Sequence, residues 1–533
     1  MDDVWWKTGI IYQIYPRSFQ DSDGDGIGDL AGIRRRLHYV AELGVEAIWI
    51  SPIYPSPMAD FGYDVMDYCD IDPRFGSLQE FDRLVADARR HGLEVILDFV
   101  PNHSSDRHPW FVESRRSRSS ARRNWYIWRD PGPGGGPPNN WLSHFGGSAW
   151  EFDAATGQYY YHAFLKEQPD LNWRNPEVRG AMHDVLRFWL RRGVAGFRVD
   201  VIDHLIKDDQ YRDNPPAGAR ASGTGLDPLY TTDRPELADV IAGMRGVLEE
   251  FAGSGPPRIL IGEAHVPLAR LMAYYGRSSA GVLDGVQLPF NFHLIGAAWE
   301  AGVIDRLVRD YEAALPVGAW PNWVLGNHDE RRIASRVGAQ QARVAAMLLL
   351  TLRGTPTLYY GDEIGMTDVA IPFDEIQDPF KSKEPGGSPG RDPQRTPMQW
   401  DGSPNAGFTT ASPWLRLGPD WPLRNVAALG GQPGSILDLY RRLIALRRSS
   451  PPLNRGAWEP LQSSGPVLAY ARVHDGRRMT VALNLSAEPV VARLAGVTSA
   501  ATVRLSTYLD RQGGGAGPDV ELRAGEGVVI GEI

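Results

Sequence analysis

The chain has 533 residues, a length that suits one large barrel with smaller attached domains. Its 56 Lys and Arg residues against 65 Asp and Glu residues give a net charge of −9, so no cationic surplus exists to bind a phosphate backbone, and we expect no nucleic acid partner. The 42% hydrophobic and 23% charged fractions exclude a fibrous or wholly disordered protein. The longest apolar run, residues 344–352, is too short to span a membrane.

The cysteine content and the N-terminal residues indicate the cellular compartment of the protein. The single cysteine, Cys69, rules out an intrachain disulfide and suits a reducing cytoplasm. Residues 1–6 contain neither the basic stretch nor the apolar stretch of a secretory signal peptide. We therefore expect a cytoplasmic protein that does not associate with membranes.

Short strand-like runs alternate with amphipathic helical segments at the start of the chain. A helix is predicted over residues 30–43, where apolar residues recur near helical spacing. Another helix begins near Ser77, which forms a capping box with Glu80, and ends at residues 91–92. The run 94–100 is almost continuously apolar, as expected of a strand that is buried on both faces.

The alternation breaks over residues 104–172, which are rich in Arg, Ser, Gly, Pro and aromatic residues. We interpret this segment as an inserted subdomain. The pattern resumes with a helix whose first turn contains Pro176 and which stops at Gly193. Two long segments, 207–235 and 367–422, are predicted loops, and loops of this length in a compact domain are usually functional.

Eight strand candidates with intervening helices predict an α/β fold, a (β/α)8 TIM barrel. The candidates are residues 10–15, 47–53, 94–100, 196–202, 258–263, 286–290, 323–326 and 356–360. The alternative is an open doubly wound sheet, which is disfavoured because no Gly-rich phosphate-binding fingerprint follows the first strand.

The end of the chain differs from the barrel pattern. Strand-like runs at residues 467–473 and 478–485 predict a small antiparallel β domain. The predicted domains are a catalytic barrel (1–103 and 173–455), a subdomain B inserted after the third strand (104–172) and a C-terminal β domain (456–533).

Charged and polar residues gather where the predicted barrel strands end: His103, Arg198, Asp200, Glu263, His328 and Asp329. Because active sites of such barrels lie at the C-terminal ends of the strands, we expect these side chains to meet at one rim. A single carboxylate at a strand end is often only a helix cap. Three of them beside two histidines and an arginine favour a functional site.

Local geometry strengthens this prediction for Arg198 and Asp200. The two residues are two positions apart on a strand, so both side chains point to the same face. We expect the guanidinium to lower the pKa of Asp200 and to keep it ionised, as a nucleophile requires. A second carboxyl group with a raised pKa would then donate the proton, and such pairs carry out glycoside hydrolysis. A purely structural ion pair is the alternative.

The segment 21–29 presents oxygen atoms at alternating positions, which suits a hard cation. The candidate ligands are the side chains of Asp21, Asp23, Asp25 and Asp29 and the main-chain carbonyl of Ile27. Gly26 stands where an EF-hand loop turns sharply, but Gly32 replaces the Glu that closes an EF-hand. Water or another group would have to complete the shell, and an acidic turn without metal is the alternative.

Several ordered motifs resemble those of one family over essentially the whole chain. They are Gln13-Ile-Tyr-Pro-Arg-Ser-Phe19, Asp98-Phe-Val-Pro-Asn-His103, Gln168-Pro-Asp-Leu-Asn172, Gly196-Phe-Arg-Val-Asp200, Gly262-Glu263, Asn327-His-Asp329 and Arg395-Thr-Pro-Met-Gln-Trp400. The chain resembles the α-amylase superfamily of retaining α-glycosidases, in particular its oligo-1,6-glucosidase and α-glucosidase branch.

The resemblance implies roles for individual residues. Asp200 would be the nucleophile, Glu263 the acid/base and Asp329 the carboxylate that binds the distorted sugar. The other residues implied to contact substrate are Asp60, Tyr63, His103, Phe145, Arg198, His328 and Arg395. The acidic loop would hold a structural Ca²⁺, for which Mg²⁺ could substitute, and no organic cofactor is expected. The inserted subdomain would form one wall of a pocket that admits a single chain end.

The function implied by the resemblance is the exo-acting release of glucose from short α-1,4- or α-1,6-linked oligosaccharides through a covalent glucosyl-enzyme. A transglucosidase or a sucrose or trehalose isomerase would use the same intermediate. A non-catalytic relative would lack the carboxylates. Val201 is typical of α-1,6 activity, but residues 263–267 depart from the oligo-1,6-glucosidase pattern, so both linkages stay open. The sequence predicts no particular oligomeric state.

Overall fold

The computed structural model describes residues 4–217, 225–279, 282–380, 388–462 and 465–531. Residues 1–3 of the N-terminal segment discussed above lie outside the described residues. The same is true of residues 218–224 and 381–387, which belong to the two long predicted loops.

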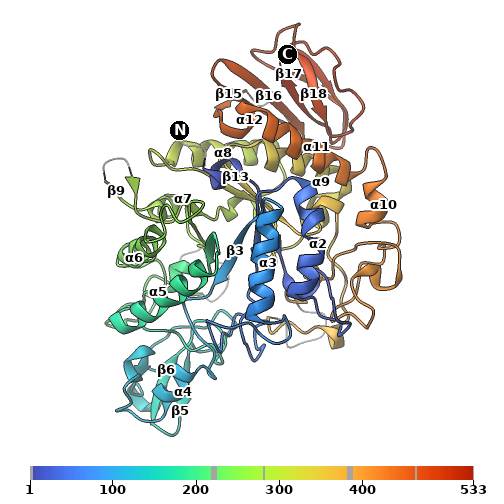
Figure 1. The fold of residues 1–533 in the computed structure, drawn as a ribbon. Helices are drawn as coiled ribbons and strands as arrows, with labels where there is room; N and C mark the ends of the chain where they lie inside the picture. The colour runs from blue at the N-terminus through green and yellow to red at the C-terminus, as the bar shows by residue number, and fades with distance from the viewer. Residues whose placement is uncertain (1–3, 218–224, 280–281, 381–387, 463–464, 532–533) are drawn as a thin grey trace.

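Eight parallel strands form the centre of the molecule (Figure 1). Each strand pairs with the next barrel strand along the chain except β11 (Leu288–Pro289), which no ladder among the described residues joins to β12 (Asn322–Val324). The last strand pairs with the first, so the order is that of a nearly closed barrel. The predicted fold class is confirmed. The strands are β1 (Ile11–Ile14), β2 (Ala47–Ile50), β3 (Glu94–Phe99), β7 (Gly196–Val199), β8 (Ile259–Gly262), β11 (Leu288–Pro289), β12 (Asn322–Val324) and β13 (Thr355–Tyr359).

Helices surround the strands, and their ends follow from capping residues. Asp29 caps α2 by accepting from the backbone N–H of Gly32, and Gly44 ends that helix in the left-handed conformation with φ 96°. Ser77 caps α3 as predicted. The principal helices are α2 (Leu30–Leu43), α3 (Leu78–Arg90), α5 (Pro176–Arg191), α6 (Leu237–Glu249), α7 (Leu268–Leu271), α8 (Ala301–Ala314), α9 (Ile333–Thr351), α10 (Val426–Gly430) and α11 (Ile436–Ser449). Among the described residues, none of the helices has the length and apolarity to cross a membrane.

The segment between β3 and α5 contains α4 (Pro109–Arg115) and a small antiparallel sheet in the order β4 (Trp128–Arg129), β6 (Gln158–Tyr161), β5 (Trp150–Asp153). Trp141, Trp150 and Tyr161 form a local core there. Other aromatic residues of this segment, Phe111, Trp125, Tyr126 and Tyr160, belong to the main core that it shares with the barrel. The predicted domain boundaries stay predictions.

The end of the chain forms two antiparallel sheets, in the orders β14-β15-β16-β20-β18 and β17-β19. The bounds are α12 (Pro451–Arg455), β14 (Ala457–Pro460), β15 (Val467–His474), β16 (Arg477–Asn484), β17 (Val490–Arg493), β18 (Thr502–Ser506), β19 (Asp519–Leu522) and β20 (Gly527–Gly531). This unit packs against α8, α9 and α12. In Figure 1 it lies above the barrel, whereas the segment between β3 and α5 lies below it.

Candidate active site

A cavity of about 1160 Å³ opens at the C-terminal ends of the barrel strands. It is lined by predicted catalytic and substrate residues: Asp60, Tyr63, His103, Phe145, Asp200, Glu263 and Asp329. The other three predicted residues, Arg198, His328 and Arg395, are buried and bond to lining residues. The strand ends thus bring the predicted set together.

Arg198 is the centre of the first charge cluster. Its Nη1 lies 2.7 Å from Oδ1 of Asp200 and 2.7 Å from Oδ1 of Asp98, and its Nη2 pairs with Oε2 of Glu263. Asp98 stands opposite Arg198 in the register of β3 and β7. Three carboxylates therefore share one buried guanidinium, and Asp200 and Glu263 are held by its two neighbouring nitrogens.

The protonation order in this cluster differs from the expected one. Burial raises the pKa of Asp200 well above its ordinary value, and burial raises the pKa of Asp98 to about 6. Burial alone would also raise the pKa of Glu263, but Arg198 and His265 outweigh it and lower that pKa to about 2. The expectation that Asp200 is the more acidic group is wrong for this arrangement, because Arg198 serves Glu263 as well as Asp200.

Val201 follows Asp200 in a strained backbone conformation. Its φ of 38° and ψ of 49° are left-handed, which is rare for a β-branched residue and costs about 1–3 kcal/mol. The backbone N–H of Val201 donates to Oε2 of Glu263 at 3.0 Å. The turn that follows Asp200 therefore also helps to orient the carboxylate of Glu263.

Asp329 is the centre of the second charge cluster. Its Oδ1 lies 2.7 Å from Arg395 Nη2 and 3.2 Å from Arg391 Nη1. Burial would raise the pKa of Asp329, but His328 and the arginines hold it far below its ordinary value. Burial lowers the pKa of His328 to about 3, so at neutral pH the positive charges beside Asp329 are those of the arginines. Asp329 is therefore ionised across the physiological range.

His328 and Tyr63 form an aromatic wall beside this carboxylate. The rings stack with centroids 5.5 Å apart, and the Tyr63 hydroxyl lies 2.6 Å from His328 Nε2. That hydroxyl also donates to Asp98 at 3.1 Å. Tyr63 thus connects the two clusters.

Asp60 and His103 are joined through Gln168, which bonds both of them. Arg391 Nη2 lies 2.6 Å from Asp60 Oδ1. Phe145 packs edge-to-face on Phe380 with ring centroids 5.2 Å apart. The cavity lining therefore combines hydrogen-bonding groups with aromatic surface.

Sequence reasoning missed three functional residues. Asp98 is the first residue of the motif at 98–103, but the family resemblance implies no role for it. Arg391 lies four residues before the motif that begins at Arg395, and it connects Asp60, Asp329 and Asp378. His265 lies 3.6 Å from Glu263 and was noted only as a departure from the family pattern. The spacing of Arg391 and Arg395, one helical turn apart in a polar loop, was the available signal.

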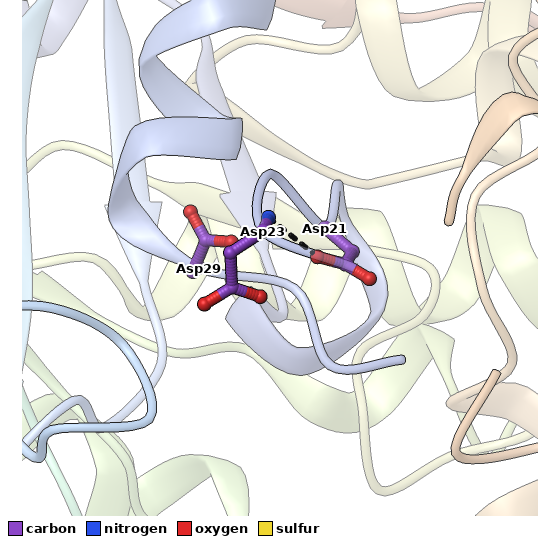
Figure 2. Close-up of side chains that lie close together, drawn as sticks. All are labelled: Asp21, Asp23 and Asp29. Carbon is purple, nitrogen blue, oxygen red and sulfur yellow. Dashed lines mark hydrogen bonds between the residues drawn. The ribbon is translucent and has the colours of Figure 1, made fainter. Parts of the chain in front are cut away.

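The acidic loop brings together part of the predicted metal set. Carboxylate oxygens of Asp21, Asp23 and Asp29 lie within 4.8 Å of one another, as Figure 2 shows. Asp25 is outside that group and accepts the backbone N–H of Ile27 at 2.7 Å. Three convergent carboxylates repel one another without a counter-charge, so this donor set fits a hard cation.

The acidic loop also contacts the segment that carries Arg395. The backbone N–H groups of Asp21 and Trp414 bond the carbonyls of Phe408 and Gly26 at 3.1 and 3.0 Å. Ser18 donates to the carbonyl of Arg395. The loop therefore supports one wall of the active site from outside.

Comparison with known families gives one match that covers most of the chain. Residues 13–456 match the family described as the alpha amylase catalytic domain. A probable alpha-glucosidase of Rhizobium meliloti is 42% identical over 510 residues, which is 92% of this chain and 91% of the relative. An oligo-1,6-glucosidase of Parageobacillus thermoglucosidasius is 37% identical over 531 residues, which is 93% of this chain and 92% of that protein.

The similar solved structures include enzymes whose names describe reactions other than hydrolysis. An alpha-glucosyl transfer enzyme is 38% identical with a TM-score of 0.92, and the match covers 100% of both chains. A trehalulose synthase of Pseudomonas mesoacidophila MX-45 is 33% identical with a TM-score of 0.91, again over 100% of both chains. The chain is thus similar over more than nine-tenths of its length to proteins named as glucosidases, and over its full length to an enzyme named for glucosyl transfer and to a trehalulose synthase.

Proposed function

Because the chain belongs to the α-amylase family and is a glycoside hydrolase, we propose that it is a retaining, exo-acting α-glucosidase. It releases glucose from the non-reducing end of short α-1,4- or α-1,6-linked oligosaccharides. The observation that carries the proposal is the sharing of Arg198 by Asp200 and Glu263. A retaining mechanism needs its two carboxyl groups at short range, and a common guanidinium keeps them there.

In the proposed mechanism Asp200 attacks the anomeric carbon while Glu263 protonates the departing glycosidic oxygen. Positive charge then develops on the sugar, and this favours the ionised form of Asp200 despite its burial. Glu263, now a carboxylate, takes a proton from the water that hydrolyses the glucosyl-enzyme. Arg198 keeps both carboxylates in position throughout.

The second charge cluster is proposed to bind the sugar. Asp329 is ionised and partly open to the cavity, with 28% of its side chain exposed, so it can accept hydrogen bonds from sugar hydroxyls. Arg391 and Asp60 present a donor and an acceptor side by side for the hydroxyls at the end of the chain. A sugar that extends beyond this end would collide with them, which supports exo action.

Glucosyl transfer is the second candidate function, favoured by the full-length similarity to the transfer enzyme and the trehalulose synthase. It differs only in whether water or a bound sugar reaches the glucosyl-enzyme first. Chromatography of products at high substrate concentration separates the two. Free glucose alone supports hydrolysis, whereas new oligosaccharides or an isomerised disaccharide support transfer.

We further propose that Asp21, Asp23 and Asp29 hold Ca²⁺, or Mg²⁺ in its place. When bound, the cation neutralises the loop. The roles of Asp25 and of the Ile27 carbonyl in this set stay proposals. We place the enzyme in the cytoplasm, where a chain with the single cysteine Cys69 needs no disulfide.

The direct test is glucose release from maltose, isomaltose, sucrose and trehalose by the wild type and by Asp200→Asn. We expect activity on maltose or isomaltose, and a fall in kcat/KM on the order of 10⁴-fold or more in the variant, because the nucleophile is lost. Asp184→Asn is the matched control, since Asp184 is exposed on α5. A variant at Asp200 with wild-type rates would refute its assignment as nucleophile.

A further inference from the structure

His265 lies in the cavity beside Glu263, and the mechanism above does not use it. It follows β8 by a few residues, and 58% of its side chain is exposed. The imidazole stacks on Phe292 with ring centroids 4.5 Å apart and an interplanar angle of 3°. The ring is therefore fixed in orientation and open to exchange protons with water.

The two oxygens of Glu263 have different partners. Oε2 accepts from Arg198 and from the backbone N–H of Val201. Oε1 lies 3.6 Å from Nε2 of His265. This distance is longer than a hydrogen bond but within range of an ion pair. Because Oε2 already accepts from Arg198 and Val201, we take Oε1 as the oxygen that carries the proton.

We propose that His265 is a positioning residue that stores, on its imidazole, the proton that Glu263 delivers to the leaving group. The inference rests on the proposed function, since it takes Glu263 as the acid/base. In the first step Nε2 and Oε1 close from 3.6 Å to hydrogen-bond distance, the Nε2–H bond of the imidazolium breaks and an O–H bond forms at Oε1 of Glu263, which leaves both groups neutral. That O–H bond then breaks as the proton passes to the glycosidic oxygen.

The return path closes the cycle. The carboxylate of Glu263 accepts a proton from the attacking water, and the new O–H can give this proton back to Nε2. The proton count is therefore balanced over one turnover, and no other reactant is needed.

The electrostatic surroundings favour a protonated imidazole. Partial desolvation by the cavity walls would lower the pKa of His265, but the contact with Glu263 and the charges of Asp203 and Asp329 raise it above its ordinary value. The low pKa of Glu263, about 2, means that the shared proton rests on the imidazole. The titratable groups that face His265 from the surrounding elements are Glu263, Asp203, Asp329, Glu330, His144 and His204.

A shared proton has a measurable consequence. A pair of coupled groups loses its last proton at a pH no lower than either group would alone. Without an imidazole at position 265, Glu263 must hold the proton by itself beside Arg198. Because the ordinary pKa of Glu is about two units below that of His, the alkaline limb of kcat/KM should move to lower pH by about one to two units.

The test measures kcat/KM against pH for the wild type, His265→Gln and His265→Asn, with maltose or isomaltose, whichever the wild type uses. An aryl α-glucoside with an activated phenolate leaving group is the second substrate, because its departure needs little protonation. We expect the downward shift with the disaccharide and none with the aryl glucoside. His91→Gln is the control, since His91 is exposed at the end of α3.

An unmoved or upward-shifted limb in His265→Gln and His265→Asn, with glucose still released by the wild type, overturns this inference alone. A wild type that releases no glucose from any substrate overturns the proposed function and this inference together.

Discussion

Two clusters of charge line the same cavity and handle protons in opposite ways. Around Arg198, three carboxylates share one guanidinium, and the pKa of Asp200 is raised by burial. Around Asp329, two arginines serve the carboxylate, and its pKa is lowered. The first cluster therefore contains a carboxyl group that holds its proton more tightly than usual, whereas the carboxylate of the second cluster remains ionised. The ratio of arginines to carboxylates decides which role each cluster takes.

The largest expected effect comes from removing the guanidinium of the first cluster. Arg198→Met leaves three buried carboxylates without a cation, and we expect a loss of about 3–5 kcal/mol of stability at neutral pH. Unpaired buried carboxylates have raised folded-state pKa values, so the folded variant binds protons more tightly than the unfolded chain. Its stability should therefore recover as pH falls and diminish as pH rises.

Denaturant unfolding of Arg198→Met at several pH values checks this. Arg187→Met is the control, because Arg187 makes surface ion pairs with Asp184 and Glu250, and such pairs contribute about 0–1 kcal/mol. Equal losses in the two variants, or a loss independent of pH, would contradict the description of the first cluster.

A smaller effect is expected from the second cluster. Arg391→Gln removes the cation that connects Asp60 with Asp329 and leaves both less well oriented. We expect kcat/KM for the disaccharide to fall about 100- to 1000-fold, partly through a lower kcat and partly through a higher KM. Steady-state kinetics of Arg416→Gln provide the matched comparison, since that arginine lies on the same long loop but pairs with Glu375 at the surface. Unchanged kinetics in Arg391→Gln would remove it from the site.

The smallest effect concerns the acidic loop, whose carboxylates do not line the cavity among the described residues. Chelation of Ca²⁺ should lower the unfolding temperature by a few degrees, because a ligand that binds only the folded state stabilises it. Asp23→Asn should abolish the response to Ca²⁺, whereas Asp184→Asn, which changes an exposed carboxylate on α5, should retain it. Calorimetry with and without Ca²⁺ measures this. A wild type that is indifferent to chelator and to added Ca²⁺ would refute the metal proposal.

Local signals in the sequence predict the barrel and the polar residues at its strand ends, whereas Asp60, Tyr63, Phe145 and Arg395 are predicted only by the family resemblance. Buried strands read as apolar runs, and side chains at parallel strand ends must meet at one rim. Asp98 and its partner Arg198 are 100 positions apart, so only the register of β3 and β7 reveals their contact. Arg391 lies on a long loop whose apolar residues follow neither helical nor strand spacing, so the sequence does not indicate where its side chain lies in the fold.

The protonation order could not be predicted for a related physical reason. Sequence shows that Arg198 and Asp200 share a face of one strand, which suggests an exclusive pair. The structure adds Asp98 from β3 and Glu263 from the end of β8, which compete for the same guanidinium. A pKa depends on every charge within a few ångströms, and those charges come from several elements.

The stereochemistry of the first product tests the central claim most directly. The claim is that Asp200 and Glu263, held by Arg198, form and hydrolyse a covalent glucosyl-enzyme. Proton NMR of the reaction in its first minutes resolves the two anomers of glucose before they interconvert. We predict that α-glucose appears first, since two displacements retain configuration. Initial release of β-glucose would show a single displacement and contradict the account.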